Sequence, residues 1–301
     1  MKLKSFILIT GSSGFLGSKI YESILINQYN IIILKSKNSK VEFLTDIANN
    51  IQYEFSESGI DLVFLNYKID FIIHTATCYG RNNEDTSFIV KSNLTLPLYL
   101  IEKAISNNVK NFFYSGTLLK SSLNPYSISK YQFEMWGKYY SENNKINFVN
   151  FKLENFFGPG EGPSKFVSWL LNSLINRVDS LNFTDCLQKR DFIYIDDAIN
   201  AIQLIINSKP TGYVEYEIGY GNSISVKEFI YLVIDVMSDI IPTQITTNLN
   251  FGSLPKRVGE PEKIEANIQN LIALGWKPKY NLEEGIKETI NHIIKQNNLD
   301  V

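Results

Sequence analysis

Short runs of continuous hydrophobic residues alternate with longer stretches in which apolar positions recur every three or four residues. Continuous runs of this length are typical of buried strands, and the three-to-four spacing is typical of helices packed on one face. The predicted strands cover residues 5–10, 31–34, 51–55, 70–77, 111–117 and 146–153. The predicted helices follow residue 17, cover 88–106 with an interruption at Pro97, and extend through Tyr126 to about Tyr140. Strands that alternate with helices predict an α/β fold, a Rossmann-like doubly wound parallel sheet.

This alternation ends after residue 153. Residues 154–163 contain three glycines and two prolines, as expected where a chain crosses between domains. The later pattern is irregular, with helices predicted at 165–177, from Asp197 to Ile206, at 226–237 and at 282–295, and a strand at 214–218. We therefore predict a dinucleotide-binding domain of residues 1–157, to which 188–212 return, and a smaller mixed α/β substrate domain of residues 158–187 and 213–301.

Composition narrows the classes of partner. The 301 residues include 29 Lys+Arg and 31 Asp+Glu, a net charge of -2, so the chain lacks the basic surplus of nucleic-acid-binding proteins. Two cysteines and two histidines argue against a disulfide framework and a metal site. We find no apolar run of about 18 residues and expect a cytoplasmic protein without membrane insertion.

A glycine-rich turn, Gly11-Ser12-Ser13-Gly14-Phe15-Leu16-Gly17, stands between the first predicted strand and the first helix. Such a turn directs backbone N–H groups and a helix N-terminus at one point, where a pyrophosphate can bind. The glycines serve the tight turn, the approach of phosphate and helix-on-strand packing. This position favours a dinucleotide site over an ordinary structural turn.

The second strand ends in Lys35-Ser36-Lys37. In a dinucleotide fold this tip meets the adenosine ribose, where an acidic residue would bind the 2′-hydroxyl of NAD. The tip carries two lysines and no acid, so we predict NADP(H) in preference to NAD(H). The alternative interpretation is a pair of solvated lysines at a strand end.

Small polar residues follow two further strands. Ala76 and Thr77 end the strand that contains His74, and Thr117 ends the strand at 111–117. Ligands of doubly wound sheets bind beyond the carboxyl ends of the strands, so we expect these residues at the cofactor crevice. His74 itself is interpreted as a packed core residue.

Tyr126 and Lys130 are four residues apart, just after Asn124-Pro125. On a helix two such side chains share one face, and an ammonium beside a phenol favours the phenolate. The pair suits proton transfer near neutral pH, although the same spacing also occurs on ordinary solvated helix faces.

Six segments together resemble the extended short-chain dehydrogenases/reductases, the NAD-dependent epimerase/dehydratase family of enzymes that act on nucleotide sugars. They are the glycine turn, His74-Thr75-Ala76-Thr77, the Tyr126 and Lys130 pair, Asn155-Phe156-Phe157-Gly158-Pro159-Gly160, Arg190-Asp191-Phe192-Ile193-Tyr194-Ile195-Asp196-Asp197 and Leu274-Gly275-Trp276-Lys277-Pro278. Within that family the chain looks most similar to the CDP-abequose synthase type, which reduces the 4-keto group of a CDP-linked dideoxyhexulose with NADPH.

The resemblance implies a role for each matching residue. Tyr126 would donate the proton, Lys130 would hold the nicotinamide ribose, and Thr117 would hydrogen-bond the reacting oxygen. The implied cofactor site consists of Gly11, Ser13, Gly14, Phe15, Leu16, Gly17, Lys35, Ser36, Lys37, Thr75, Ala76, Thr77, Asn93, Tyr126 and Lys130. The implied substrate site consists of Tyr79, Asn155, Lys165, Phe166, Arg190 and Arg257, the two arginines meeting the diphosphate because a guanidinium can bind phosphate oxygens in pairs. Lys152 replaces the usual arginine of the family and is expected to be structural.

The chain departs from the family pattern near Thr117. Dehydratases place an Asp-Glu pair directly after this position, whereas Leu118 and Leu119 stand here and cannot supply the acid and base of an elimination. Thr117 also precedes Tyr126 by only nine residues, a shorter loop than the family has.

Three hypotheses follow. The first is an NADPH-dependent nucleotide-sugar 4-ketoreductase that serves the biosynthesis of surface polysaccharide such as the O-antigen of lipopolysaccharide. The second is an NAD-dependent 4-epimerase, and the third is a non-catalytic dinucleotide-binding protein. The resemblance also implies a homodimer formed through two helices of each subunit.

Overall fold

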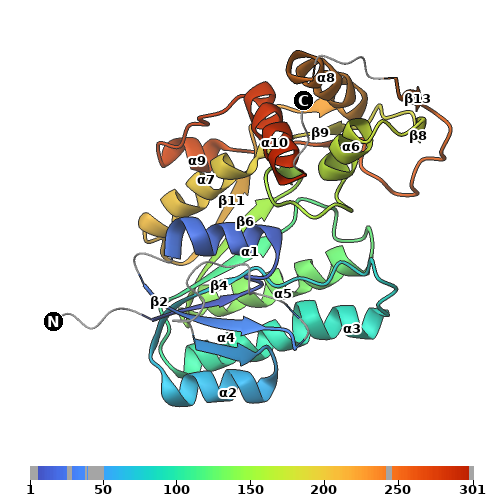
Figure 1. Ribbon diagram of the computed structural model, residues 1–301. Helices are drawn as coiled ribbons and strands as arrows, with labels where there is room; N and C mark the ends of the chain where they lie inside the picture. Colours follow the sequence, from blue (N-terminus) through green and yellow to red (C-terminus); the bar gives the residue numbers. More distant parts are fainter. Residues whose placement is uncertain (1–5, 26–28, 38, 40–50, 242–245, 298–301) are drawn as a thin grey trace. The chain divides into compact units, whose positions relative to one another are not determined.

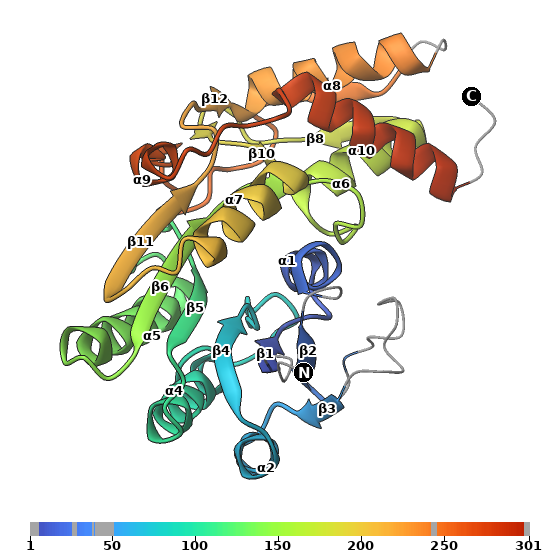
Figure 2. The ribbon, with the colours of Figure 1, turned by 90° about the vertical axis from the view of Figure 1, so that its left-hand side faces the viewer.

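The computed structural model describes residues 6–25, 29–37, 39, 51–241 and 246–297. The chain divides into two compact units, one of residues 1–152 and 202–216 and the other of residues 153–201 and 217–301. Figures 1 and 2 show the two units in two orientations, and each is described below by itself.

Within the described residues, seven strands form the sheet of the first unit, in the order β11-β6-β5-β4-β1-β2-β3. The strands are β1 (Phe6–Thr10), β2 (Asn30–Lys35), β3 (Ile51–Glu54), β4 (Ile69–His74), β5 (Asn111–Gly116), β6 (Asn147–Leu153) and β11 (Tyr213–Ile218). Strands β1 to β6 pair in parallel. The order 3-2-1-4-5-6 is that of a doubly wound dinucleotide-binding sheet, which confirms the predicted fold class.

The helices of the first unit connect successive strands. They are α1 (Phe15–Ile20) with the π-helical η1 (Tyr21–Leu25), α2 (Glu57–Asn66), α3 (Thr86–Val90), the π-helical η3 (Lys91–Thr95), α4 (Leu96–Ser106) and α5 (Pro125–Glu142). Pro97 lies at the start of α4, directly after the π-helical η3, and α3, η3 and α4 follow one another without a break. The helix α2 was not among the sequence predictions; Ser56 caps it by accepting from Gly59 N.

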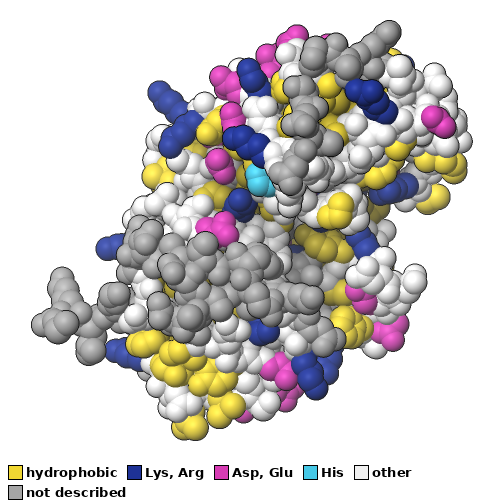
Figure 3. Space-filling view, viewed as in Figure 1, with side chains coloured by type: hydrophobic (Ala, Val, Ile, Leu, Met, Phe, Trp, Pro, Cys, Tyr) yellow, Lys and Arg dark blue, Asp and Glu magenta, His cyan; other side chains and the backbone are white. Residues whose placement is uncertain are grey.

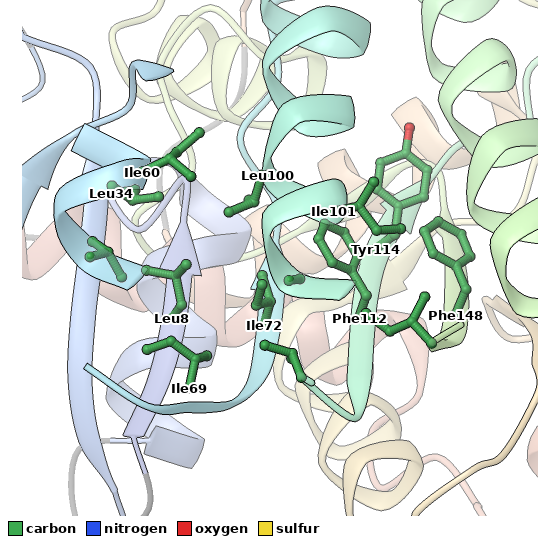
Figure 4. Packing of buried hydrophobic residues seen from close by; sticks show 14 of the residues in the cluster. Leu8, Leu34, Ile60, Ile69, Ile72, Leu100, Ile101, Phe112, Tyr114 and Phe148 are labelled. Atoms are coloured by element: carbon green, nitrogen blue, oxygen red, sulfur yellow. The ribbon is translucent and has the colours of Figure 1, made fainter. Parts of the chain in front are cut away.

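The main core of the first unit lies on the side of the sheet that α2, α4 and α5 cover. Figure 4 labels ten of its side chains, which come from the five strands β1, β2, β4, β5 and β6 and from α2 and α4. Leu8, Ile72 and Phe112 are fully buried there, as is Phe133 of α5. In Figure 2, α1 lies on the opposite side of the sheet from α2. Burial on both faces explains why these strands are continuously apolar.

The second unit contains short strands and longer helices. The strands are β7 (Phe156–Phe157), β8 (Ser180–Asn182), β9 (Lys189–Arg190), β10 (Ile193–Tyr194), β12 (Ile224–Ser225), β13 (Asn248–Asn250) and β14 (Lys263–Ile264). The helices are α6 (Phe166–Ile175), α8 (Val226–Ile240), α9 (Gln269–Ala273) and α10 (Leu282–Gln296). β7 pairs with β10, β9 with β12 and β14, and β8 with β13. Phe157, Phe192 and Phe229 pack in its core.

The unit boundaries differ from the domain boundaries expected from the sequence. The first unit ends at residue 152 and regains residues 202–216, which include the second half of α7 (Ile195–Asn207) and most of β11. From the sequence, residues 188–212 are expected to return to the dinucleotide-binding domain, and the strand at 214–218 is expected in the substrate domain. Strand β11 instead extends the large sheet beside β6, a neighbour some 60 residues away in sequence that local pattern does not reveal.

Candidate functional site

The glycine-rich turn is built by close backbone packing. Gly11 has φ +76°, and a Cβ on it would lie 2.4 Å from Ala76 N. A Cβ on Gly17 would lie 2.2 Å from Gly11 O, so any larger residue at either position would displace backbone. The turn is closed by the N–H of Gly14, which donates to Gly11 O at 2.9 Å.

Helix α1 starts at Phe15, directly after the glycine turn. Gly14 is its N-cap residue and makes no side-chain hydrogen bond to the start of the helix. A close-packed glycine turn before a helix start is the kind of segment that binds a pyrophosphate, and the dinucleotide site predicted here stays a prediction.

The tip of β2 carries the residues predicted to select the dinucleotide. Lys35 Nζ donates to the carbonyl oxygen of Ser39 at 2.9 Å, and the hydroxyls of Ser36 and Ser39 lie 2.6 Å apart. Lys37 is exposed. Residues 40–50 lie outside the described residues, so the preference for NADP(H) stays a prediction.

Strand β4 ends in a set of hydrogen bonds with β1. Thr75 Oγ1 donates to Thr10 O at 2.8 Å, and Ala76 N donates to Thr10 Oγ1 at 3.2 Å. Thr10 Oγ1 also lies 2.7 Å from His74 Nδ1. Burial lowers the pKa of His74 well below its ordinary value, so the imidazole is neutral. His74 packs against the rings of four neighbours, as expected for a core residue: Phe55, Phe112, Tyr114 and Phe133.

Asn93 joins the loop after β4 to helix α5. Its Oδ1 accepts from Cys78 N, and its Nδ2 donates to Cys78 O, both at 2.8 Å. Its Nδ2 also lies 3.1 Å from Ser129 Oγ, between Tyr126 and Lys130 in sequence. Asn93 therefore fixes the loop against α5, and its predicted contact with the cofactor stays a prediction.

Helix α5 starts with a capping box that places Tyr126 in its first turn. Asn124 Oδ1 accepts from Ser127 N at 2.9 Å, Ser127 Oγ accepts from Asn124 N at 3.1 Å, and Pro125 is the first helical residue. The side chain of Lys130 follows that of Tyr126 by one turn. Thr117 stands directly after β5, and its Oγ1 accepts from Leu119 N at 3.2 Å.

The side chain of Lys130 is buried, with 2% of its surface exposed. Its Nζ lies 3.2 Å from Thr77 Oγ1 and 4.3 Å from the ring centroid of Tyr114. Burial lowers the pKa of Lys130 to about 7, and the charge of Glu134 opposes this fall. The predicted Tyr126–Lys130 pair and Thr77 are thus held in one unit.

A partly buried ion network lies one turn further along α5. Lys152 Nζ lies 3.0 Å from Glu134 Oε1 and 3.1 Å from Glu215 Oε2, and Tyr213 OH donates to both carboxylates. This network joins α5, β6 and β11. It agrees with the structural role expected of Lys152.

Tyr79 lies against the predicted proton donor. The ring centroids of Tyr79 and Tyr126 are 5.0 Å apart, and the Cζ of Arg81 lies 5.1 Å from the Tyr79 ring centroid. Arg81 was not predicted as a site residue, since nothing in the sequence distinguishes it from other surface arginines.

The predicted substrate residues of the second unit lie in different environments. Arg190 is buried and donates to Glu260 Oε1 at 2.7 Å and to Pro261 O at 2.9 Å. Arg257 is exposed, and its carbonyl oxygen accepts from Glu260 N at 3.2 Å. Glu260 therefore connects the segments of both arginines, and their binding of a diphosphate stays a prediction.

Asn155, Lys165 and Phe166 also belong to this unit. Asn155 has φ +47°, and its buried Nδ2 has no partner among the described residues. Lys165 is the N-cap residue of α6, and the ring of Phe166 contacts those of Trp169, Phe192 and Phe229. Phe166 therefore contributes to packing, whereas the Asn155 amide is a group that a ligand could satisfy.

Two carboxylates of the Arg190–Asp197 segment organise the second unit, a role that the sequence analysis did not assign. Asp191 accepts from the N–H groups of Tyr220, Gly221 and Ala266 at 2.8, 2.9 and 3.2 Å. Asp197 accepts from those of Lys279 and Tyr280, at 2.7 and 3.1 Å, and from Tyr220 OH at 3.0 Å. Each residue joins segments far apart in the chain, which sequence spacing does not indicate.

The residues that the structure describes contain no group of three His, Cys, Asp or Glu side chains placed to hold a metal ion. None of their helices combines the length and the hydropathy needed to cross a membrane.

Residues 7–219 match the NAD dependent epimerase/dehydratase family. The chain belongs to this family. Its members are the extended short-chain dehydrogenases/reductases that act on nucleotide sugars, so the chain is an enzyme of this kind. The family membership confirms the resemblance seen in the sequence.

Several family members are similar over the whole chain. CDP-abequose synthase of Salmonella typhimurium is 30% identical over 97% of this chain and 99% of its own length. A putative UDP-glucose 4-epimerase of Methanocaldococcus jannaschii is 28% identical over 97% of this chain and 99% of its own length. Among solved structures, UDP-glucose 4-epimerase of Thermotoga maritima with UDP-glucose has a TM-score of 0.83 at 24% identity and covers 97% of this chain and 99% of its own. The last likeness supports the fold alone.

Proposed function

We propose that this family member reduces the 4-keto group of a nucleotide-linked deoxy sugar with NADPH, with CDP-4-keto-3,6-dideoxyhexose as the first candidate substrate. The observation that carries the proposal is the arrangement around α5. Lys130 is buried against Thr77 one turn from Tyr126, and two leucines follow Thr117 where an elimination would need an acid and a base. This arrangement suits carbonyl reduction and lacks the groups for loss of water.

In the proposed reaction the ketone carbon gains a hydride and its oxygen gains a proton. A dinucleotide bound at the glycine turn would supply the hydride. Tyr126 OH donates the proton as negative charge develops on the oxygen, and Thr117 donates a hydrogen bond to the same atom. Lys130 favours the phenolate left on Tyr126, because a nearby ammonium stabilises a negative charge.

Two features support the choice of CDP and NADPH. The relative at 30% identity is a CDP-abequose synthase, and it is similar over nearly the full length of both chains. The tip of β2 carries Lys35 and Lys37, two cations suited to a 2′-phosphate, with no acid at residues 35–37. The product would enter the synthesis of a surface polysaccharide.

The test is a screen of purified protein for oxidation of NADPH and of NADH with CDP-, GDP-, dTDP- and UDP-linked 4-keto-6-deoxy sugars. We expect NADPH to be consumed with a CDP sugar and the product to be a 4-hydroxy sugar by NMR. Tyr126→Phe is the matched negative control. A protein that oxidises neither dinucleotide with any of these sugars contradicts the proposal.

A 4-epimerase is the second candidate, favoured by the 28% identity to the putative UDP-glucose 4-epimerase. An epimerase returns the hydride to the opposite face of the sugar, so it keeps its NAD and consumes none. Protein that purifies with bound NAD and interconverts two sugars without net oxidation of NADPH would establish this candidate instead.

We also propose a homodimer formed through α5. This helix exposes hydrophobic side chains along one face: Ile128, Tyr131, Met135, Trp136 and Tyr139. A contiguous apolar face of this kind is typical of an interface. Figure 3 shows a second group of hydrophobic side chains around α2, where Leu65 is 79% exposed.

The two faces provide a matched pair of variants. We expect Met135→Glu to convert a dimer to a monomer in light scattering, because it places a charge in the proposed interface. Leu65→Glu, an equal change on α2, should leave the dimer intact. The opposite pattern would move the interface to α2, and a wild-type protein that is monomeric at micromolar concentration would refute it.

A further inference from the structure

Tyr114 lies directly beneath the cation of the proposed site. It is the fourth residue of β5, fully buried, and its ring centroid is 4.3 Å from Lys130 Nζ. Its hydroxyl donates to the backbone carbonyl oxygen of Lys130 at 3.1 Å. The same side chain therefore contacts both the ammonium and the main chain of Lys130.

The Lys130 ammonium lies against a hydroxyl and against the face of an aromatic ring. Thr77 Oγ1 is 3.2 Å away, a neutral hydroxyl. A positive charge over the face of an aromatic ring is attracted by the negative π-surface, most strongly where water is excluded. Lys130 is 2% exposed, so its contact with the face of Tyr114 lies where water is largely excluded.

Other titratable groups around Lys130 come from three elements. His74, beside Tyr114 on β4, is neutral because burial lowers its pKa. Burial raises the pKa of Tyr114 well above its ordinary value, so its phenol is also neutral. On α5 itself, Tyr126 lies one turn before Lys130, and Glu134 lies one turn after it and is paired with Lys152. The carboxylate of Glu134 thus already shares its charge with the cation of Lys152.

We propose that Tyr114 is a positioning residue for Lys130, its ring holding the buried side chain in the charged form and its hydroxyl fixing the helix turn. The effect of Tyr114 on catalysis rests on the proposed reduction. Its effect on the pKa of Lys130 rests only on the contacts around Lys130. A cation–π contact in a desolvated site is expected to raise the pKa of the cation by about one unit or more.

The experiment measures the titration of Lys130 without substrate or cofactor. Protein labelled with ¹³C at lysine Cε is titrated by NMR, and Lys130→Met identifies the resonance. We expect Tyr114→Leu to lower the pKa of Lys130 by about one unit and Tyr114→Phe, which keeps the ring, to leave it within a few tenths. Phe112→Leu, two residues earlier on β5 in the same aromatic cluster, is the packing control and should leave the titration unchanged.

A fluorinated series keeps the test valid if Tyr114→Leu does not fold. Phenylalanines with one, two or three fluorines at position 114 keep the shape of the ring and progressively weaken its negative face. The pKa of Lys130 should fall stepwise along this series. Equal titration of all variants, or an equal shift in Phe112→Leu, would overturn the inference.

Activity separates this inference from the proposed function. The alkaline limb of kcat/KM for reduction should move to lower pH by the same amount as the Lys130 titration, because the cation loses its proton earlier. If reduction fails with every sugar, the NMR titration still decides the role of Tyr114. If reduction proceeds and no variant shifts either profile, the function stands and the inference falls.

Discussion

Replacing Lys130 by Met is expected to abolish activity and to stabilise the fold. Lys130 is 2% exposed, and burial lowers its pKa from an ordinary value of 10.5 to about 7. Between these values the unfolded chain holds the proton and the folded chain does not, so the stability of the wild type rises with pH in this range. Below pH 7 the folded state bears the full cost of the buried charge.

The size of the effect follows from this difference in pKa. At pH 7 the cost is on the order of 4 kcal/mol, since one unit corresponds to about 1.36 kcal/mol. Methionine has nearly the same length and no charge to desolvate. The Thr77 hydroxyl loses its partner, at a cost of about 1 kcal/mol, so Lys130→Met should be about 3 kcal/mol more stable. At pH 9.5 the free energies of unfolding of Lys130→Met and of the wild type should be nearly equal.

Thermal unfolding of the cofactor-free wild type and of Lys130→Met between pH 6 and 9.5 measures the difference in stability. At about 2–4 °C per kcal/mol, the midpoint at pH 7 should rise by about 8 °C. Lys138→Met on the exposed side of α5 is the control and should change the stability by less than about 0.5 kcal/mol. A Lys130→Met midpoint at or below that of the wild type at pH 7, or a difference that does not shrink as pH rises, refutes the reasoning.

Three further outcomes are expected. Tyr126→Phe should lower kcat by about 10²–10⁴-fold, and Thr117→Val should lower it by about 10²–10³-fold. Neither variant should change the affinity for the dinucleotide in a fluorescence titration. Weaker dinucleotide binding as the main defect would contradict these roles. Lys152→Met should lower the free energy of unfolding, measured by urea denaturation, by about 3–5 kcal/mol, because it leaves the carboxylate of Glu134 buried without its cation. An unchanged free energy of unfolding would show that water solvates the network. Asn93→Ala should lower the free energy of unfolding by about 1–3 kcal/mol and raise the rate of hydrogen exchange at the N–H of Cys78. Exchange in the second unit should not change.

The local sequence was sufficient to predict most strands of the large sheet and the elements that carry the candidate site residues. Continuous apolar runs are typical of strands buried on both faces, and the strands found at residues 6–10, 30–35, 69–74, 111–116 and 147–153 agree with those predicted. The glycine turn and the capping residue Asn124 are local signals too, because they act on backbone within a few residues. The positions of Gly11–Gly17, Tyr126 and Lys130 on their elements therefore followed from the sequence.

Contacts between distant segments were decided only by the tertiary structure. β11 joins the large sheet beside β6, whereas its own sequence shows only that it is a strand. In the sequence, nothing distinguishes Tyr114 from the other aromatic residues of its strand. Its contact with Lys130 depends on how α5 packs on β5. Hydrogen bonds and cation–π contacts act over a few ångströms in space, so the sequence determined which groups are present, and the folded chain determined which of them meet.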